Sequence, residues 1–305
     1  MQLLILLTLT IVGLTVYKKY FLATRYEGFQ QSDKYILKSE EKVYDDFYCQ
    51  IYDDLMLPET RTEYEVSKII EMTQPNTQYS SFLDVGSGTG SLVNRLKEKG
   101  YNAYGIDKSK SMVAKSQTKF PKTFIKCGDA LEPITFDRGT FTHIICTGFT
   151  IYEIENKAQF FQNCYFWLQP NGYLILHLVD KDTFDPIIPA GKPRVLDSPQ
   201  KYSNQRITET LIDFIDFKYK STYDFSKSDG RVIHKETFND NQTQNIRENE
   251  RTLFMKNTED ILSISTKYGF IVKGKVIMGE PNTEINGKEN VDSPSQYLYI
   301  LERIM

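Results

Sequence analysis

The sequence has few of the residues that build metal centres or disulfide frameworks. Its 305 residues include three histidines, which are far apart in the chain, and four cysteines, none of them in a Cys-x-x-Cys pair. The cysteines are Cys49, Cys127, Cys146 and Cys164. We therefore expect no metal site, and we expect buried, reduced thiols in a reducing compartment rather than disulfides.

An excess of positive charge is also missing. The chain has 37 Lys and Arg residues against 40 Asp and Glu residues, with a net charge of -3 and a pI of about 5.8. A protein surface that binds nucleic acid needs clustered basic residues, so nucleic acid is not expected as a partner. The length allows one large or two small domains with a full core.

The first segment lacks charge altogether. Residues 1–16 read MQLLILLTLTIVGLTV, and Lys18 and Lys19 follow. A bilayer-spanning helix needs about 17 residues or more, which this run reaches when it extends to residue 22. Positive residues after the run favour a cytosolic location for the rest of the chain. We predict a single-pass membrane anchor over residues 1–22 and a linker over 23–39; a cleaved signal peptide and a packed or amphipathic helix are the alternatives.

The stretch FLDVGSGTGSL, from Phe82 to Leu92, organises the remainder of the chain. A short apolar strand is followed by three glycines two residues apart and then by a helical pattern from Ser91 to Lys99. Glycines let the backbone approach a ligand, and a helix start offers unpaired N–H groups, so we predict a ligand site. A tight turn without a ligand is the alternative. A dinucleotide site needs glycine where Ser91 stands, and Asp84 would repel a pyrophosphate.

Further strand-and-helix units follow in order. They cover Tyr101–Ser109, Thr123–Ala130, Phe141–Ile154 and Leu168–Asp180. Such alternation predicts a parallel sheet with helices on both faces. The connection from Leu131 to Gly139 is short, so any helix in it is limited to a single turn.

These segments together resemble the class I S-adenosyl-L-methionine (S-adenosylmethionine)-dependent methyltransferases. The sequence D-V-G-S-G-T-G is similar to motif I of that family, and the resemblance spans Tyr79 to Asp180. It implies an α/β Rossmann-like methyltransferase fold with a mostly parallel seven-stranded sheet, and S-adenosyl-L-methionine as the cofactor. The apolar runs Phe270–Met278 and Gln296–Arg303 fit the terminal hairpin of the family, whose last strand is antiparallel.

The resemblance also implies cofactor contacts. Asp107 would accept hydrogen bonds from the ribose, Asp84 would lie near the methionine ammonium through Thr89 or water, and Met112 would pack on the adenine. The full set is Tyr48, Tyr52, Asp84, Gly86, Gly88, Thr89, Gly90, Asp107, Met112, Asp129, Ala130 and Thr147. The two tyrosines belong to a predicted helix over residues 40–56, under which they could instead simply pack.

The catalytic candidates follow the predicted strand ends. They are Tyr152, Glu153 and His177, with Asp180 nearby. His177 alternates with core residues, so a packed histidine is the alternative reading. An N-P-P-Y signature is absent, and Cys146-Thr147-Gly148-Phe149 stands in its place, which disfavours methylation of nucleic-acid bases or of glutamine in release factors.

The region from 181 to 256 differs from the rest. A loop with four prolines over Lys181–Asn204 precedes segments that alternate polar and apolar residues, with Asp229-Gly230 as a hairpin signal. We predict an antiparallel insert that forms a lid; a sheet that packs away from the site is the alternative. The methyltransferase domain would then cover residues 40–305, with its core over 79–180 and 257–305.

The functional prediction is methyl transfer to an unidentified small molecule, lipid or protein at a membrane, with the catalytic domain facing the cytosol. Methyl transfer mainly requires placing the nucleophile in line, so the acceptor leaves little trace in the sequence. An NAD(P)-dependent oxidoreductase and a non-catalytic S-adenosylmethionine-binding protein are the alternatives.

Overall fold

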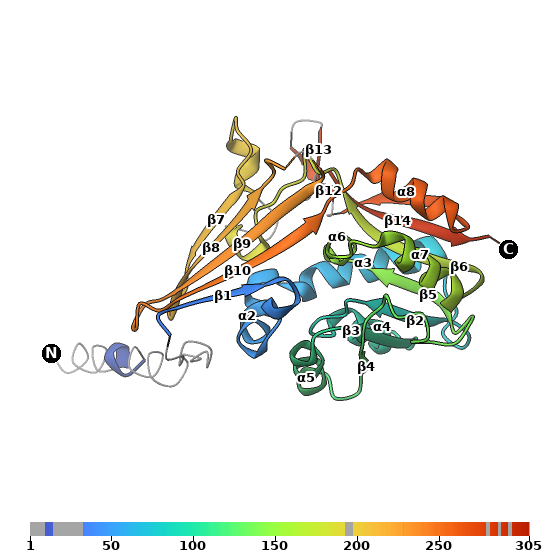
Figure 1. Ribbon diagram of the computed structural model, residues 1–305, viewed down its shortest axis with the longest axis horizontal. Helices are drawn as coiled ribbons and strands as arrows, with labels where there is room; N and C mark the ends of the chain where they lie inside the picture. The colour runs from blue at the N-terminus through green and yellow to red at the C-terminus, as the bar shows by residue number, and fades with distance from the viewer. Residues whose placement is uncertain are drawn as a thin grey trace.

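The computed structural model describes residues 10–14, 33–192, 198–227, 229–278, 281–285, 288–291 and 295–304. Two sheets dominate it, with the N-terminal helices lying between them (Figure 1). The predicted anchor lies outside the described residues apart from 10–14. Among the described residues, no helix combines the length and the apolar character needed to cross a bilayer.

The larger sheet has seven strands in the order β11-β14-β6-β5-β2-β3-β4. Neighbours from β6 to β4 are parallel, whereas β14 is antiparallel to both β6 and β11. This arrangement confirms the predicted mostly parallel sheet with a reversed last strand. The strands are β2 (Ser81–Val85), β3 (Asn102–Asp107), β4 (Phe124–Cys127), β5 (Phe141–Cys146), β6 (Leu168–Val179), β11 (Phe270–Ile277) and β14 (Gln296–Arg303).

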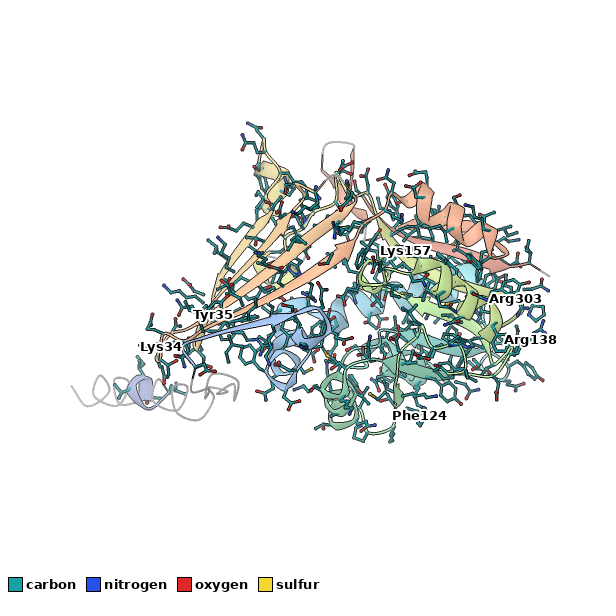
Figure 2. All side chains as sticks on the ribbon, viewed as in Figure 1. Lys34, Tyr35, Phe124, Arg138, Lys157 and Arg303 are labelled. Carbon is teal, nitrogen blue, oxygen red and sulfur yellow. The ribbon has the colours of Figure 1, made fainter. Side chains whose placement is uncertain are left out.

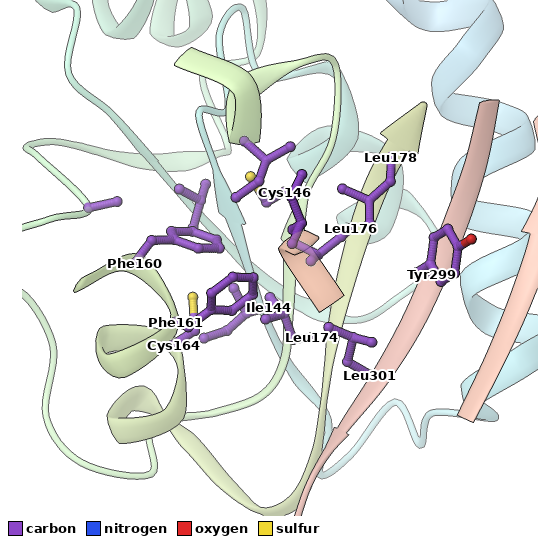
Figure 3. Packing of buried hydrophobic residues seen from close by; sticks show 14 of the residues in the cluster. Ile144, Cys146, Phe160, Phe161, Cys164, Leu174, Leu176, Leu178, Tyr299 and Leu301 are labelled. Carbon is purple, nitrogen blue, oxygen red and sulfur yellow. The ribbon is translucent and has the colours of Figure 1, made fainter. Parts of the chain in front are cut away.

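Helices cover both faces of this sheet. They are α4 (Ser91–Glu98), α5 (Lys110–Lys119), α6 (Thr150–Glu153), α7 (Lys157–Trp167) and α8 (Thr258–Lys267). Phe160, Phe161 and Cys164 of α7 pack against aliphatic side chains of β5, β6 and β14, which forms the core seen in Figure 3. From residue 128 to 140, all described, the chain forms turns and no helix, as its shortness predicted.

Strand β4 lies at the edge of the sheet, where Phe124 projects outward (Figure 2). Cys127 on this strand is exposed, so the prediction that it is a buried thiol in a central strand is wrong. The other three cysteines are buried, and all four are free thiols.

The predicted helix over residues 40–56 is divided into η2 (Glu40–Val43) and α2 (Asp46–Met56). The reason is Asp45, whose side chain accepts a hydrogen bond from the Tyr48 N–H and starts a new helix. Leu57 adopts a left-handed conformation, and α3 (Pro58–Thr73) begins directly after it.

The second sheet has five strands in the order β1-β10-β9-β8-β7. Its last four strands form the predicted antiparallel insert: β7 (Glu209–Asp213), β8 (Phe217–Asp224), β9 (Arg231–Asp240) and β10 (Ile246–Phe254). The fifth, β1 (Tyr35–Ser39), pairs parallel with β10 and occupies part of the predicted linker. One face of this sheet packs on α2 through Phe47 and Phe238. Lys34 and Tyr35 mark its outer end (Figure 2).

Short elements complete the described part. They are η3 (Pro189–Gly191), η4 (Pro199–Tyr202), β12 (Pro281–Ile285) and β13 (Lys288–Val291). The short helix η3 lies in the proline-containing loop after β6 and contacts α2 and β7.

Candidate functional site

Two cavities meet between the larger sheet and the second sheet. The glycine-loop cavity, of about 860 Å³, is lined by the ends of β2, β3 and β4, including Gly88, Asp107 and Ala130. The outer cavity, also about 860 Å³, is lined by α3, the loop after β6 and the second sheet. Residues that line both cavities are here called the junction residues, and they are Tyr44, Tyr52, Gly148, Glu153 and Arg251.

The three glycines of the loop after β2 all have positive φ angles, which glycine adopts without strain. Their surroundings differ. A Cβ on Gly86 would meet the Thr150 side chain at 2.5 Å, and one on Gly90 would meet Ile125 at 2.9 Å. A Cβ on Gly88 would find nothing nearer than the Tyr52 ring at 4.0 Å, on the cavity side. Gly88 therefore keeps the cavity open, whereas Gly86 and Gly90 permit close packing.

Asp107 ends β3 beside this loop. Its Oδ2 accepts a hydrogen bond from the Gly88 N–H at 2.8 Å, and its Oδ1 accepts one from the Ser109 N–H at 2.8 Å. Burial raises the pKa of Asp107, and these two backbone hydrogen bonds act to lower it. Each carboxylate oxygen keeps a further lone pair for a ligand, so the residue can receive two neighbouring hydroxyl groups.

The far end of the glycine-loop cavity is apolar. Met112 and Ala130 are buried in its wall, and Asp129 lies at the edge. The Asp129 carboxylate accepts a hydrogen bond from the Leu131 N–H at 2.8 Å and pairs with Lys108 at 3.1 Å. An apolar wall with an acceptor at its rim suits a flat ring that bears an amino group.

Asp84 is buried beneath the glycine loop, and Thr89, which together with water was one of two predicted links from Asp84 to the ammonium group, does not donate to it. The Thr89 hydroxyl donates to Asp53 at 2.7 Å instead. Asp84 lines a small adjoining cavity of about 40 Å³ together with Arg61 and Thr147. Burial, with the charge of Glu65 as a further cause, raises the pKa of Asp84 well above its usual range.

Arg61 of α3 is a site residue that the sequence prediction missed. Its guanidinium lies over Gly148, where a Cβ would meet Nη2 at 2.9 Å. It also pairs with Glu65 at 3.2 Å, one helical turn further on, and Glu65 accepts a 3.4 Å hydrogen bond from Thr147. The i, i+4 spacing from Arg61 to Glu65 was the only available signal in the sequence.

Arg251 of β10 joins the second sheet to the junction. Its Nη1 donates to the Tyr44 hydroxyl at 2.5 Å and lies 3.5 Å from Glu153 Oε1. The Tyr44 hydroxyl in turn donates to Glu153. Tyr44 and Glu153, which line both cavities, are thus held together by one guanidinium group.

The other side of Arg251 is anchored in the second sheet. Its Nη2 donates to His234 Nδ1 at 2.8 Å and to Glu236 at 3.0 Å. Glu236 is fully buried and also accepts hydrogen bonds from Tyr48 at 2.9 Å and Tyr219 at 2.7 Å. These groups make a buried polar network that joins β8, β9, β10 and α2 at the junction.

The pKa shifts in this network follow its geometry. Burial acts to raise the pKa of Glu236, but the charge of Arg251 and the hydrogen bonds outweigh it, and the pKa is lowered. Burial and Arg251 lower the pKa of His234 to about 3, which keeps this ring neutral. Burial raises the pKa of Glu153, although Arg251 and Tyr44 act in the opposite direction.

The structure separates the three catalytic candidates. Glu153 is a junction residue. Tyr152 lines neither cavity, because its ring is buried in the core and its hydroxyl accepts a hydrogen bond from the Val179 N–H at 2.8 Å. His177 lines the outer cavity and donates from Nε2 to Gln296 at 3.1 Å; burial lowers its pKa to about 3.

Of the two predicted tyrosines, Tyr48 and Tyr52, only one lines the cavities. Tyr52 is a junction residue, whereas Tyr48 lines neither cavity because its hydroxyl is used by Glu236. Asp180 lines neither cavity and accepts a hydrogen bond from the Asp182 N–H at 3.0 Å.

Comparison with known proteins agrees with this arrangement. The solved structure of an S-adenosylmethionine-dependent methyltransferase from Clostridium acetobutylicum ATCC 824 matches with a TM-score of 0.60 at 18% identity, over 85% of this chain and 98% of that one. The family model described as "Methyltransferase domain" matches residues 83–176. Residues 83–176 are thus similar to a methyltransferase domain, and the chain shares the fold of S-adenosylmethionine-dependent methyltransferases.

Two further similarities fit this methyltransferase assignment. The CcbJ methyltransferase from Streptomyces caelestis shares the fold with a TM-score of 0.61, at 11% identity, over 86% of this chain and 98% of that one. The proposed methyltransferase YqeM of Bacillus subtilis (strain 168) is 30% identical over 135 residues, which are 42% of this chain. The chain spans about half the length of that relative, 52%.

The described residues fit S-adenosylmethionine. A glycine loop with an open side, a carboxylate with two spare acceptors and an apolar wall line a single cavity. Cavities of this size are typical of small-molecule sites.

Proposed function

We propose that the chain is an S-adenosylmethionine-dependent methyltransferase whose acceptor is a small molecule bound in the outer cavity. The observation that carries this proposal is the meeting of two cavities at the end of β5, at the junction residues. A methyl group must pass from one bound molecule to another without release, so two adjoining sites are needed.

The cofactor supplies a methyl group on a positively charged sulfur. Asp107 would accept the ribose hydroxyls, and Met112 and Ala130 would pack on the adenine. At the other end, Asp84 and Arg61 provide a carboxylate for the ammonium group and a guanidinium for the carboxylate of the methionine part. Gly88 would let the backbone approach between these two ends.

Binding and product formation test the proposal. We expect purified protein to bind S-adenosylmethionine in calorimetry and not to bind NADH, because the loop lacks the third dinucleotide glycine. Incubation with a small-molecule extract is expected to yield S-adenosylhomocysteine. NADH binding without S-adenosylmethionine binding would support the oxidoreductase alternative, and cofactor binding without product in any extract would support the non-catalytic one.

We further propose, from the sequence alone, that residues 1–22 hold the enzyme at a membrane with its catalytic domain in the cytosol. The full chain is then expected to stay with membranes after carbonate extraction, and a chain that starts at residue 23 is expected to be released. Protease added to sealed vesicles whose cytosolic face is outside should digest the domain. Carbonate release of the full chain would rule out the anchor.

A further inference from the structure

We infer, on the basis of the proposed function, that the acceptor is an amine and that Glu153 receives the proton its ammonium group must lose. The acceptor atom must lie where the two cavities meet, because only there can it approach the methyl group. Among the junction residues, Glu153 has the only carboxylate. Its side chain is 33% exposed, so it can contact a ligand and exchange protons with water.

The charges around the junction favour a cation over an anion. Arg251 lies between two carboxylates, at 3.0 Å from Glu236 and 3.5 Å from Glu153. Since His234 is neutral, Arg251 and the two carboxylates it binds carry one net negative charge together when both carboxylates are ionised. The rings of Tyr44 and Tyr52 add faces that attract an ammonium group.

The outer cavity offers no unpaired cation among its described residues. Arg251 is paired with two carboxylates, and each of the other positive side chains in the wall also has a carboxylate partner. The pairs are Arg61–Glu65 at 3.2 Å, Lys68–Glu71 at 2.7 Å and Lys192–Asp185 at 3.1 Å. A phosphate or carboxylate on the acceptor would therefore compete with an existing carboxylate partner at each of these described cations, and at Arg61 also with the methionine carboxylate of the cofactor. Apolar side chains such as Phe184 and Leu253 suit an apolar body instead.

The available base also fits an amine better than an alcohol. Burial raises the pKa of Tyr44 and Tyr52, and burial lowers the pKa of His177 to about 3, so none of these groups is a base of useful strength. An alkyl ammonium has a pKa of about 10, within reach of a carboxylate whose own pKa is raised. A hydroxyl proton is held about as firmly as that of water, with a pKa of about 15.7.

The step is balanced by these groups. Glu153 takes one proton from the ammonium nitrogen, which frees the lone pair on that nitrogen. The cofactor supplies the methyl carbon, whose bond to sulfur breaks with the electron pair going to sulfur as the bond to nitrogen forms. The product nitrogen is then a methylated ammonium, and Glu153 releases its proton to water.

The test compares amines with alcohols of the same shape. Benzylamine with benzyl alcohol and tryptamine with tryptophol are titrated into the full-length protein by calorimetry, without cofactor. We expect one or both amines to bind at least roughly tenfold more tightly than the matched alcohol. Glu153→Gln should abolish this preference, whereas Glu63→Gln should keep it, because Glu63 lies at the cavity rim and pairs with Arg95 and Lys99.

The pH dependence separates this role from a structural one. The preference needs ionised Glu153, so it should be present above the raised pKa of Glu153 and be lost as the pH falls through it. Tyr44→Phe removes a hydrogen bond that lowers this pKa, so it should move the loss to higher pH. A solely structural role would leave that midpoint unchanged.

Each outcome has a clear meaning. Equal binding of amines and alcohols, or a preference that survives Glu153→Gln, overturns the inference. If cofactor binds and only alcohols are methylated, the proposed function stands and the amine inference fails. If no cofactor binds, the proposed function itself fails.

Discussion

Replacing Asp107 by alanine is expected to weaken S-adenosylmethionine binding by roughly 100-fold. Each oxygen of this carboxylate is oriented by one backbone N–H and keeps a lone pair for a ribose hydroxyl. Hydrogen bonds to a charged group contribute about 1.5–3 kcal/mol each, and about 1.4 kcal/mol corresponds to a factor of ten in affinity. The effect is measured as the dissociation constant in calorimetry. Asp107→Asn keeps one side-chain oxygen, so its dissociation constant should fall between those of the unchanged protein and of Asp107→Ala.

Asp129→Ala is the matched control for this experiment. Asp129 lies at the edge of the same cavity, where its partly exposed carboxylate pairs with Lys108 and would accept a single hydrogen bond from an amino group. We expect a loss of less than roughly tenfold, as for one partly exposed hydrogen bond. If Asp107→Ala binds the cofactor as tightly as the unchanged protein, the ribose does not lie at this carboxylate.

The second large effect concerns stability. Gly90→Ala is expected to lower the free energy of unfolding by roughly 2–4 kcal/mol, the sum of backbone strain and overpacking. Its φ of 85° is unfavourable for alanine, and the new Cβ would lie 2.9 Å from Ile125 and 3.1 Å from Ser116. Both neighbours are buried and cannot move away freely. Urea unfolding followed by circular dichroism measures the difference.

Gly88→Ala tests whether neighbouring glycines have different roles. At Gly88 the φ is 52° and the nearest atom to a new Cβ is 4.0 Å away, so only strain of about 1 kcal/mol is expected. The added methyl group would lie on the cavity side and should weaken cofactor binding instead. If Gly88→Ala and Gly90→Ala lost equal stability, the proposal that Gly90 permits close packing while Gly88 keeps the cavity open would be contradicted.

The sequence predicted the parts of the site that depend on local order. The glycine loop follows β2, Asp107 ends β3 and Met112 lies in the helix after β3. Because neighbouring parallel strands end at the same edge of the sheet, two short motifs place all of them on the same cavity. The reversed β14 was predicted from the resemblance to the methyltransferase family, whose terminal hairpin the apolar runs Phe270–Met278 and Gln296–Arg303 fit. Tyr152 and Glu153 could not be told apart, since neighbouring positions on the four-residue helix α6 point in different directions.

The network around Arg251 could not be predicted, because it depends on which face of β10 is buried. Strand β10 reads IRENERTLF, in which Arg247, Asn249 and Arg251 are buried while Glu248 and Glu250 are not. Alternation of polar with polar residues gives no hydrophobic signal for either face. The partner strand β1 was also missed, because its pairing with β10 joins residues more than 200 positions apart in the sequence.

The same two arginines have a consequence for how the second sheet is assembled. Arg247 binds Asp45, the residue before α2, at 2.9 Å, and Arg251 binds Glu236 of β9 at 3.0 Å, so each has its own carboxylate partner. A slip of β10 by two residues would keep the same face inward but break at least the present pairing of each guanidinium group with its acid, which is unfavourable for buried charges. Strand register, which in most sheets is specified by apolar side chains, is therefore specified here by charge.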